Sequence, residues 1–304
     1  MRKYYSNGKL LLSGEYLILD GATGLALPTK AGQEMLVNTY DSERILFWES
    51  CDNLGHIWFE GSFSLPDLKL ISFTGQEMVA QTLQRILVQA KKANPAFLQT
   101  DRGIHVTTKL QFPRDWGLGS SSTLINNIAL WAGINAFELL FKGFGGSGYD
   151  VACAQHDQAI LYKLDNSVPH IEIVDFDPLF KEQLYFVHLN KKQISSQSIA
   201  NYKKKNVEHD MLLAISDISK KFLTSTNLDE FNELIKEHEA IISGILDMEP
   251  VQKTLFSDFK GQTKSLGAWG GDFILATGDE SAKAYFKQKG FETVIPYTSM
   301  IKTL

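Results

Sequence analysis

The sequence has few of the features that mark specialised classes of protein. Two cysteines, Cys51 and Cys153, are too few for a disulfide framework and favour a reducing compartment. No apolar run reaches the length of a membrane-spanning helix, and the first seven residues lack the apolar core of a signal peptide. We therefore expect a cytoplasmic protein with no membrane partner.

An excess of positive charge is also missing. The 304 residues carry a formal net charge of −5, which argues against a nucleic-acid partner. The local basic run Lys203-Lys204-Lys205 is better explained as the solvated face of a helix. Hydrophobic residues make up 44% of the chain and charged residues 21%, as in ordinary globular proteins, so we expect one large domain or two of usual size.

Apolar periodicity predicts an α+β chain in which strands are followed by helices in each half. The expected strands are 9–19, 34–39, 44–49, 56–62, 104–112, 184–189 and 292–296. The expected helices are 76–93, 123–141, 149–158, 195–224, 228–246 and 281–289. Between strands, within 263–276, we expect a glycine-rich segment.

Glycine and serine are concentrated in the segment Gly117-Leu118-Gly119-Ser120-Ser121-Ser122-Thr123, which leads into an apolar stretch. Glycine allows a ligand to approach the backbone closely, and the first N–H groups of a helix lack internal partners and carry partial positive charge. Such a segment at the start of a helix can hold phosphate. A flexible turn with a serine N-cap is the alternative interpretation.

This segment is not one of the better-known phosphate or hydrolase motifs. A P-loop ends in Gly-Lys-Ser/Thr, and no such ending follows a suitable glycine here. The Rossmann fingerprint needs a third glycine where Ser122 stands. A nucleophile elbow around Ser121 needs a glycine where Thr123 stands, so a serine hydrolase is not indicated.

Three further segments place glycines beside charged or aromatic residues. They are Asn7-Gly8-Lys9-Leu10-Leu11-Leu12-Ser13-Gly14-Glu15-Tyr16, Gly146-Ser147-Gly148-Tyr149-Asp150 and Lys264-Ser265-Leu266-Gly267-Ala268-Trp269-Gly270-Gly271-Asp272. Together with the Gly/Ser segment, and in this order, they resemble the motifs of the GHMP small-molecule kinases. That family includes galactokinase, homoserine kinase, mevalonate kinase and phosphomevalonate kinase. The resemblance spans residues 5 to 276.

The resemblance implies a two-domain GHMP kinase-like α+β architecture. The N-terminal domain, residues 1–180, would be β-rich, of the ribosomal protein S5 domain 2-like type, and would carry the Gly/Ser loop. The C-terminal domain, residues 181–304, would be a ferredoxin-like α+β domain. Family members hold nucleotide and substrate in a cleft between the two domains, and we expect a monomer or a homodimer.

The resemblance also implies an enzyme that uses ATP and Mg²⁺ to phosphorylate a small-molecule substrate. Backbone N–H groups from Gly117 to Ser122 would face the β- and γ-phosphates. Asp150 matches the aspartate that orients or deprotonates the acceptor hydroxyl, and Lys9 matches the lysine paired with it. The alternatives are an ordinary helix N-cap for Asp150 and a surface position for Lys9.

Other positions match family residues on the metal or substrate side. Ser120 or Ser121 would offer Mg²⁺ a hydroxyl, with Ser121 preferred, and Glu138 is a candidate second ligand. The spacing of Glu138 to Asp150 is one residue off the family pattern, so a solvated or capping role is the alternative. The predicted substrate contacts are Glu15, Tyr16, Ser147, Ser196 and Gly270. The alternative role of Glu15 is to hold Lys9, and the alternative role of Ser196 is that of a helix N-cap.

The glycine-rich segment near the C-terminus departs from the family pattern, because Trp269 stands where the middle glycine is usual. The turn must therefore tolerate ordinary backbone angles at that position. Tyr16, Gly146 and Asp272 match phosphomevalonate kinase better than mevalonate kinase. We expect phosphomevalonate or mevalonate as the acceptor, in isoprenoid precursor synthesis. A homoserine or sugar kinase and a non-catalytic GHMP-like binding protein are the alternatives.

Overall fold

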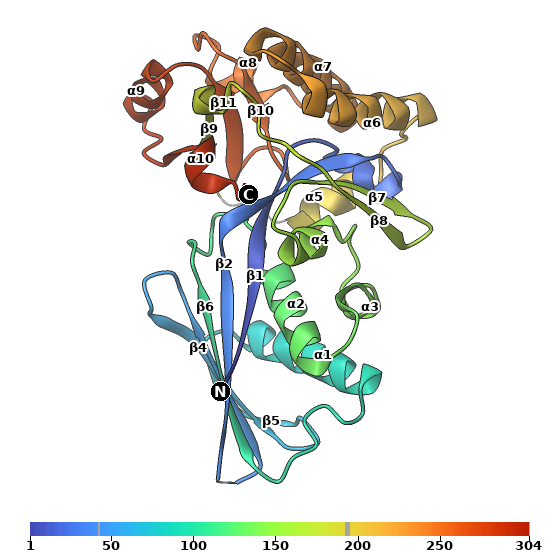
Figure 1. Ribbon diagram of the computed structural model, residues 1–304, viewed down its shortest axis with the longest axis vertical. Helices are drawn as coiled ribbons and strands as arrows, with labels where there is room; N and C mark the ends of the chain where they lie inside the picture. The colour runs from blue at the N-terminus through green and yellow to red at the C-terminus, as the bar shows by residue number, and fades with distance from the viewer. Residues whose placement is uncertain (42, 192–194, 304) are drawn as a thin grey trace. The chain divides into compact units, whose positions relative to one another are not determined.

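The computed structural model describes residues 1–41, 43–191 and 195–303, and the chain divides into two compact units (Figure 1). Unit 1 consists of Met1–Gly8, Ala31–Arg114 and Gly119–Gln155. Unit 2 consists of Lys9–Lys30, Asp115–Leu118 and His156–Leu304. Because the units interleave along the chain, the predicted division into 1–180 and 181–304 stays a prediction, whereas the mixed α+β class is confirmed.

Unit 1 is a sheet covered by helices on one face (Figure 1). Its strands follow the order β5-β4-β3-β6-β2, and β1 also pairs with β2. The β3–β6 pair is parallel, whereas β2–β6, β3–β4 and β4–β5 are antiparallel. The strands are β1 (Arg2–Leu11), β2 (Gly24–Tyr40), β3 (Ile45–Cys51), β4 (Ile57–Ser64), β5 (Leu70–Thr74) and β6 (Gly103–Leu110). The helices are α1 (Glu77–Ala93), α2 (Ser120–Ala132), α3 (Ala136–Gly143) and α4 (Tyr149–Gln155).

The core of unit 1 forms where the apolar faces of strands and helices meet. In α1 the buried residues Ala80, Leu83, Leu87 and Ala90 recur every three or four positions, so they form one stripe along the helix. In β3 buried and partly exposed residues alternate, because neighbouring side chains of a strand point to opposite faces. One cluster joins these residues to buried side chains of α2 and α3.

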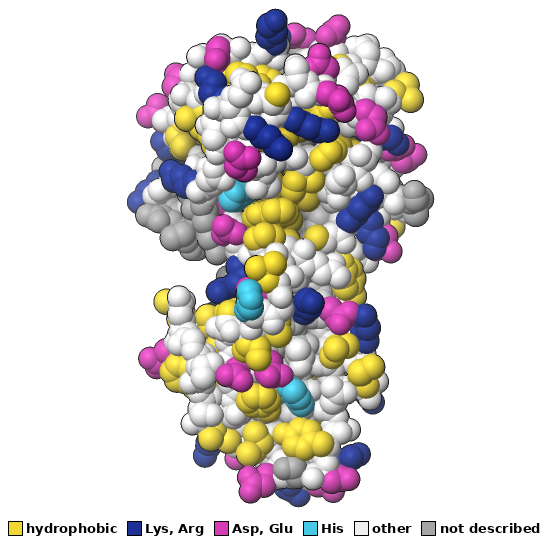
Figure 2. All heavy atoms as spheres, turned by 90° about the vertical axis from the view of Figure 1, so that its left-hand side faces the viewer, with side chains coloured by type: hydrophobic (Ala, Val, Ile, Leu, Met, Phe, Trp, Pro, Cys, Tyr) yellow, Lys and Arg dark blue, Asp and Glu magenta, His cyan; other side chains and the backbone are white. Residues whose placement is uncertain are grey.

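The opposite face of this sheet carries apolar and charged side chains side by side (Figure 2). Phe47 lies against His105, with ring centroids 5.2 Å apart, and His105 hydrogen-bonds Glu49. Such mixing of polar and apolar groups is ordinary for the solvent side of a mostly antiparallel sheet.

The predicted helix 123–141 is two helices in the structure. It divides at Gly133, which ends α2 in a left-handed conformation with φ 64°. Asn135 then starts α3, since its side chain accepts hydrogen bonds from the N–H groups of Phe137 and Glu138. A continuous apolar pattern therefore concealed a stop signal and a start signal placed two residues apart.

Unit 2 contains a four-stranded antiparallel sheet of order β10-β11-β9-β12 and a β7–β8 hairpin. Residues 9–11 of β1 and 24–30 of β2 also belong to this unit, and residues 24–26 pair with β7. The strands are β7 (Ile160–Asp165), β8 (Val168–Ile173), β9 (Leu184–His188), β10 (Thr263–Ser265), β11 (Phe273–Thr277) and β12 (Val294–Pro296). The α-helices are α5 (Ser195–Tyr202), α6 (His209–Thr224), α7 (Leu228–Leu246), α8 (Val251–Leu255), α9 (Ser281–Gln288) and α10 (Tyr297–Met300), and short 3₁₀ helices lie at Leu17–Asp20 and Lys181–Gln183.

Aromatic packing dominates the interior of unit 2. Phe256 and Phe286 lie between the sheet and the helices α8 and α9, and Phe231 of α7 contacts Phe222 of α6 at a centroid distance of 4.8 Å. The predicted helix 195–224 is divided into α5 and α6, and the predicted strand 9–19 ends at Leu11. Within the described residues, no helix is long and apolar enough to cross a membrane.

Candidate functional site

The central loop is the Gly/Ser segment 117–123. Its two glycines both have the left-handed backbone conformation that glycine adopts readily. Gly117 has φ 66° and Gly119 has φ 91°. Gly119 is the N-cap of α2 and no side chain caps the helix. The alternative of a turn capped by serine therefore does not hold, since the N-cap residue is a glycine.

The start of α2 presents backbone N–H groups. The first helical hydrogen bond runs from the Thr123 N–H to the Gly119 carbonyl, so the N–H groups of 120–122 have no acceptor inside the helix. The hydroxyls of Ser122 and Thr123 both donate to the Gly119 carbonyl, at 2.9 and 3.0 Å. Ser121, by contrast, is exposed. Ser120 is half-buried, so the backbone donors and the hydroxyls of Ser120 and Ser121 are the groups offered to a ligand here.

Asp150 lies in the first turn of α4, which packs against α2 in unit 1. The side chains of Gln155 in α4 and Asn126 in α2 are joined by a 2.9 Å hydrogen bond. Asp150 is half-buried, and its Oδ1 accepts from the Val151 N–H at 3.0 Å. Ser147, which precedes it, is buried. The packing of α4 on α2 therefore fixes Asp150 relative to α2 within unit 1.

Within unit 2 the structure brings together three of the motif segments. The Lys9 N–H donates to the Leu118 carbonyl at 3.1 Å, which joins the first segment to the central loop. A Cβ on Gly117 would lie 2.6 Å from Oδ2 of Asp272, so the central loop also meets the glycine-rich segment near the C-terminus. Only glycine permits so close an approach at that position.

The glycine-rich turn places its unusual backbone angles on either side of Trp269. Gly267, Gly270 and Asp272 have φ values of 62°, 93° and 52°, whereas Trp269 is outside the left-handed region. The expectation that the turn tolerates ordinary angles at this tryptophan is therefore confirmed. The Trp269 side chain is 3% exposed, and Gly270 is exposed. The indole ring of Trp269 is thus part of the buried core beneath the turn.

No family model matches the sequence, and no curated protein matches it by sequence. The structure is similar to Methanococcus jannaschii mevalonate kinase, at 15% identity over 96% of each chain with a TM-score of 0.72. It is also similar to Streptococcus pneumoniae phosphomevalonate kinase in complex with phosphomevalonate and AMPPNP, at 17% identity, TM-score 0.69, covering 95% of this chain and 96% of that one. Lactococcus lactis galactokinase complexed with galactose matches at 14% identity, TM-score 0.68, over 99% and 95%.

The chain has the fold of the GHMP kinases. Identities of this size establish the fold and not the acceptor, and the similar structures have different ligands, phosphomevalonate in one and galactose in another. The roles of the motif residues in this chain therefore depend on the contacts that they make within the fold.

Tyr16 ends the first motif, the segment Asn7–Tyr16, and makes several of the contacts of this motif within unit 2. Its ring stacks on Tyr202 of α5 with centroids 5.2 Å apart. Burial raises the pKa of Tyr16, while hydrogen bonds with the Ser198 side chain and the Trp269 backbone oppose that rise. The Tyr202 hydroxyl donates to Asp20. The first motif, α5 and the glycine-rich turn therefore meet at one aromatic side chain.

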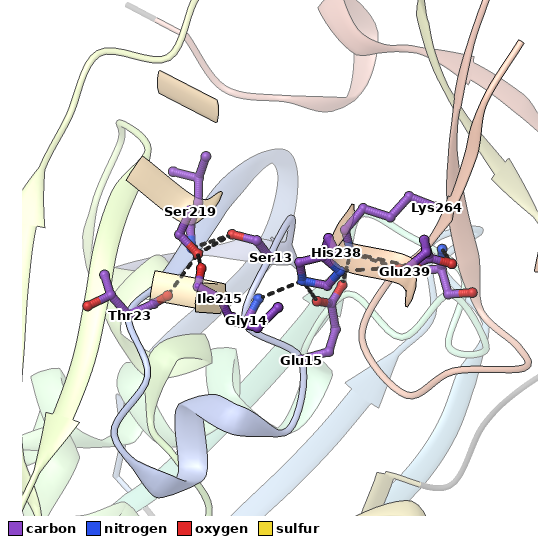
Figure 3. A network of polar contacts seen from close by, with 11 residues as sticks. Ser13, Gly14, Glu15, Thr23, Ile215, Ser219, His238, Glu239 and Lys264 are labelled. Atoms are coloured by element: carbon purple, nitrogen blue, oxygen red, sulfur yellow. Dashed lines mark hydrogen bonds and ion pairs between the residues drawn. The ribbon is translucent and has the colours of Figure 1, made fainter. Parts of the chain in front are cut away.

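Glu15 lies in a fully buried cluster of ionisable side chains (Figure 3). Its carboxylate pairs with Lys264 of β10 and lies 3.0 Å from Nε2 of His238 in α7. Glu239 is 4.0 Å from both Lys264 and His238, and it accepts a hydrogen bond from the Ser265 N–H at 3.2 Å. A direct contact between Glu15 and a substrate would require this cluster to open.

The burial of the cluster sets its charges. Burial opposes ionisation of Glu15, but Lys264 and His238 together outweigh it and hold the pKa of Glu15 below its usual range. Burial and the Lys264 charge lower the pKa of His238. Burial raises the pKa of Glu239 to about 8. At neutral pH the cluster is therefore an ion pair of Glu15 and Lys264 flanked by a neutral imidazole and a mostly protonated carboxyl group.

The raised pKa of Glu239 predicts that stability falls as pH rises from 6.5 to 8. In this window the folded carboxyl group retains a proton that the unfolded chain releases, so each pH unit costs up to about 1.4 kcal/mol. Below 6.5 the lowered pKa of His238 acts with the opposite sign. Glu239→Gln should flatten this decline, measured as the free energy of unfolding in urea at several pH values.

The matched control for this prediction is Glu233→Gln on the same helix. The Glu233 side chain is 72% exposed and pairs with Lys236 at 2.7 Å, so its removal should leave the slope with pH unchanged. Parallel pH profiles for Glu239→Gln and the wild type would contradict the assignment of this titration to Glu239.

Several predicted positions have geometries that change their interpretation. Lys264 is fully buried and paired with Glu15, so it is not available as a cation for an anionic substrate. The Glu138 side chain is 60% exposed and bonds Lys142 at 2.9 Å, which agrees with the solvated alternative. Among the described residues, no group of three His, Cys, Asp or Glu side chains is placed to hold a metal. The side chain of Ser196, a predicted substrate contact, falls outside the described part of the structure.

Sequence reasoning missed the roles of His238 and Glu239. Both lie on α7, whose apolar periodicity predicts a helix but not that it buries two ionisable side chains. The one available signal was Lys264 inside a short strand beside an apolar segment, since a buried lysine requires an acidic partner.

Proposed function

We propose that this protein is an ATP- and Mg²⁺-dependent kinase that transfers the γ-phosphoryl group to a small metabolite. The observation that carries the proposal is the start of α2, where a left-handed glycine replaces a capping side chain and leaves three N–H groups for phosphate oxygens. The similarity in fold to phosphomevalonate kinase in complex with AMPPNP supports a nucleotide as the phosphoryl donor.

In this proposal Asp150 and Lys9 act on the acceptor oxygen. Asp150 orients the acceptor oxygen and, where that oxygen is a hydroxyl, takes its proton as the new bond to phosphorus forms and ADP leaves. Lys9 stabilises negative charge at the acceptor oxygen. Ser147, Tyr16, Ser196 and Gly270 stay proposed substrate contacts. Glu15 acts at a distance from the substrate, through the buried cluster.

The magnesium ion fits one of its two predicted ligands. Mg²⁺ usually keeps several waters and takes only one or two protein oxygens besides the phosphates, so the exposed Ser121 hydroxyl is sufficient as a protein ligand. Glu138 does not fit, because its carboxylate is exposed and paired with Lys142. When bound, the ion would neutralise charge on the phosphates.

A coupled assay of ADP release over mevalonate, phosphomevalonate, homoserine and galactose tests the proposed function. We expect turnover with one acceptor class, dependent on both ATP and Mg²⁺. If nucleotide binds but no acceptor in the panel is phosphorylated, the non-catalytic alternative, a GHMP-like ligand-binding protein, is favoured instead.

Among these acceptors we predict a preference for phosphomevalonate over mevalonate. The motivation is the match of Tyr16, Gly146 and Asp272 to the phosphomevalonate kinase pattern. Two anionic substrates gathered by cations such as Lys9 and the exposed Lys191 should give a KM that rises with ionic strength, because salt screens the attraction. The measurement is kcat/KM for both acceptors at low and moderate salt, with galactose as the uncharged reference. A clear preference for mevalonate, or for the sugar, would reject this assignment and leave the kinase proposal standing.

A further inference from the structure

The backbone at Tyr16 is strained. Tyr16 has φ 63° and ψ −49°, and the Leu17 N–H donates to the Glu15 carbonyl at 2.7 Å. This is a γ-turn of the rare form with positive φ, which is unfavourable for a residue with a side chain. Strain of this kind persists only where the surrounding structure holds it, and it is concentrated at functional sites.

One set of contacts holds the turn from the side of Glu15. The carboxylate pairs with Lys264 of β10 and lies beside His238 of α7, and the Gly14 N–H donates to His238 Nε2 at 3.2 Å. Gly14 has no room for a side chain, since a Cβ there would lie 2.8 Å from Cα of Gly24. Residues 14 and 15 are therefore anchored to three other segments of unit 2.

A second set of contacts holds the turn from the side of the ring. Tyr16 is 8% exposed, stacks on Tyr202 of α5, and hydrogen-bonds the Ser198 side chain and the Trp269 backbone. A glycine at position 16 would relieve the backbone strain but would lose all three contacts. The strain is thus retained together with a side chain that links α5 to the glycine-rich turn.

The buried ion pair of Glu15 and Lys264 is not explained by a gain in stability alone. Removing Glu15 and Lys264 from water costs several kcal/mol per ion, and apolar replacements of buried pairs are often neutral or stabilising. What the pair supplies is a directional fixation of residue 15, with the partner atoms of β10 and α7 at defined places. That fixation matters at the next residue, where the backbone angles are unfavourable.

We propose that Glu15, paired with Lys264 and lying beside His238, is a positioning residue that fixes the γ-turn, so that Tyr16 orders the glycine-rich turn 267–271 and α5 for binding of the acceptor. This inference rests on the proposed kinase function. The ordering of residues 267–271 by Tyr16 and Glu15 is a structural claim, and it can be tested without a measurement of activity.

The first test is Tyr16→Phe, which keeps the ring and removes the hydroxyl that bonds Ser198 and Trp269. We expect the acceptor KM to rise about tenfold with the ATP KM unchanged, and backbone hydrogen exchange in 267–271 to become faster. The matched control is Tyr297→Phe. Tyr297 is also buried, and its hydroxyl donates to the Phe176 carbonyl at 2.8 Å, so the control loses a buried tyrosine hydrogen bond elsewhere in unit 2.

The second test couples Glu15 to Tyr16. Glu15→Gln alone leaves a buried lysine unpaired and risks loss of folding, so Glu15→Gln is combined with Lys264→Met, which removes both charges. We expect this variant to raise the acceptor KM as Tyr16→Phe does. Adding Tyr16→Phe to it should raise KM no further, because both changes would interrupt one connection.

The outcomes separate this inference from the proposed function. Active wild type with an unchanged acceptor KM in Tyr16→Phe overturns the inference, as does strict additivity of the two changes. A wild type that phosphorylates no acceptor defeats the proposed function, and hydrogen exchange then decides alone. Faster exchange of 267–271 in both variants, and not in Tyr297→Phe, supports the positioning role, whereas unchanged exchange overturns it.

Discussion

Asp150→Asn should bind ATP nearly as tightly as the wild type and turn over at least about a hundredfold more slowly. Groups that orient an acceptor or take its proton contribute on the order of 10²–10⁴ in rate, and an amide cannot take the proton. Folding should be preserved, because the amide oxygen of asparagine can still accept the 3.0 Å hydrogen bond from the Val151 N–H. Steady-state kinetics and nucleotide titration measure the two effects separately.

The matched control is Asp165→Asn in the β7–β8 hairpin. Asp165 is exposed, and its Oδ1 accepts a 3.0 Å hydrogen bond from the neighbouring Asn166, so the same chemical change occurs at a residue with only a local partner. Its kcat should equal that of the wild type. A kcat for Asp150→Asn within about threefold of the control would rule out the role assigned to Asp150, since a loss so small is below the range for such groups.

Elements with a strong one-sided pattern could be predicted from the sequence. The helix expected at 76–93 is α1, Glu77–Ala93, and the one expected at 228–246 is α7, Leu228–Leu246. In both, apolar residues recur at helical spacing and polar residues flank them, so local preference and packing agree.

Elements that depend on single backbone angles could not be predicted in the same way. The stop at Gly133 and the start at Asn135 are short signals within an apolar run, and the γ-turn at Tyr16 contradicts the local preference of a tyrosine. The turn exists because tertiary contacts to β10, α7 and α5 outweigh that preference.

The candidate site could be predicted as a set of segments but not as a set of side-chain contacts. The approach of Lys9, Leu118 and Asp272 within unit 2 follows the motif order, whereas the partner of Glu15 depends on which strand carries a buried lysine. Sequence spacing contains no information on that distance, because 249 positions separate Glu15 from Lys264.

Gly119→Val should weaken nucleotide binding by at least about tenfold while the protein remains folded. A β-branched residue is disfavoured at φ 91°, by about 1–2 kcal/mol, so the loop should move toward ordinary angles and turn the N–H groups of 120–122 away from the phosphates. The control is Gly133→Val at the other end of α2, where φ is 64° and nothing lies within 4 Å of the added Cβ. Both variants carry a similar backbone penalty and should lose similar amounts of thermal stability, but only Gly119→Val should lose ATP affinity. Equal ATP affinities for the two variants, measured by titration calorimetry, would show that this loop does not hold phosphate.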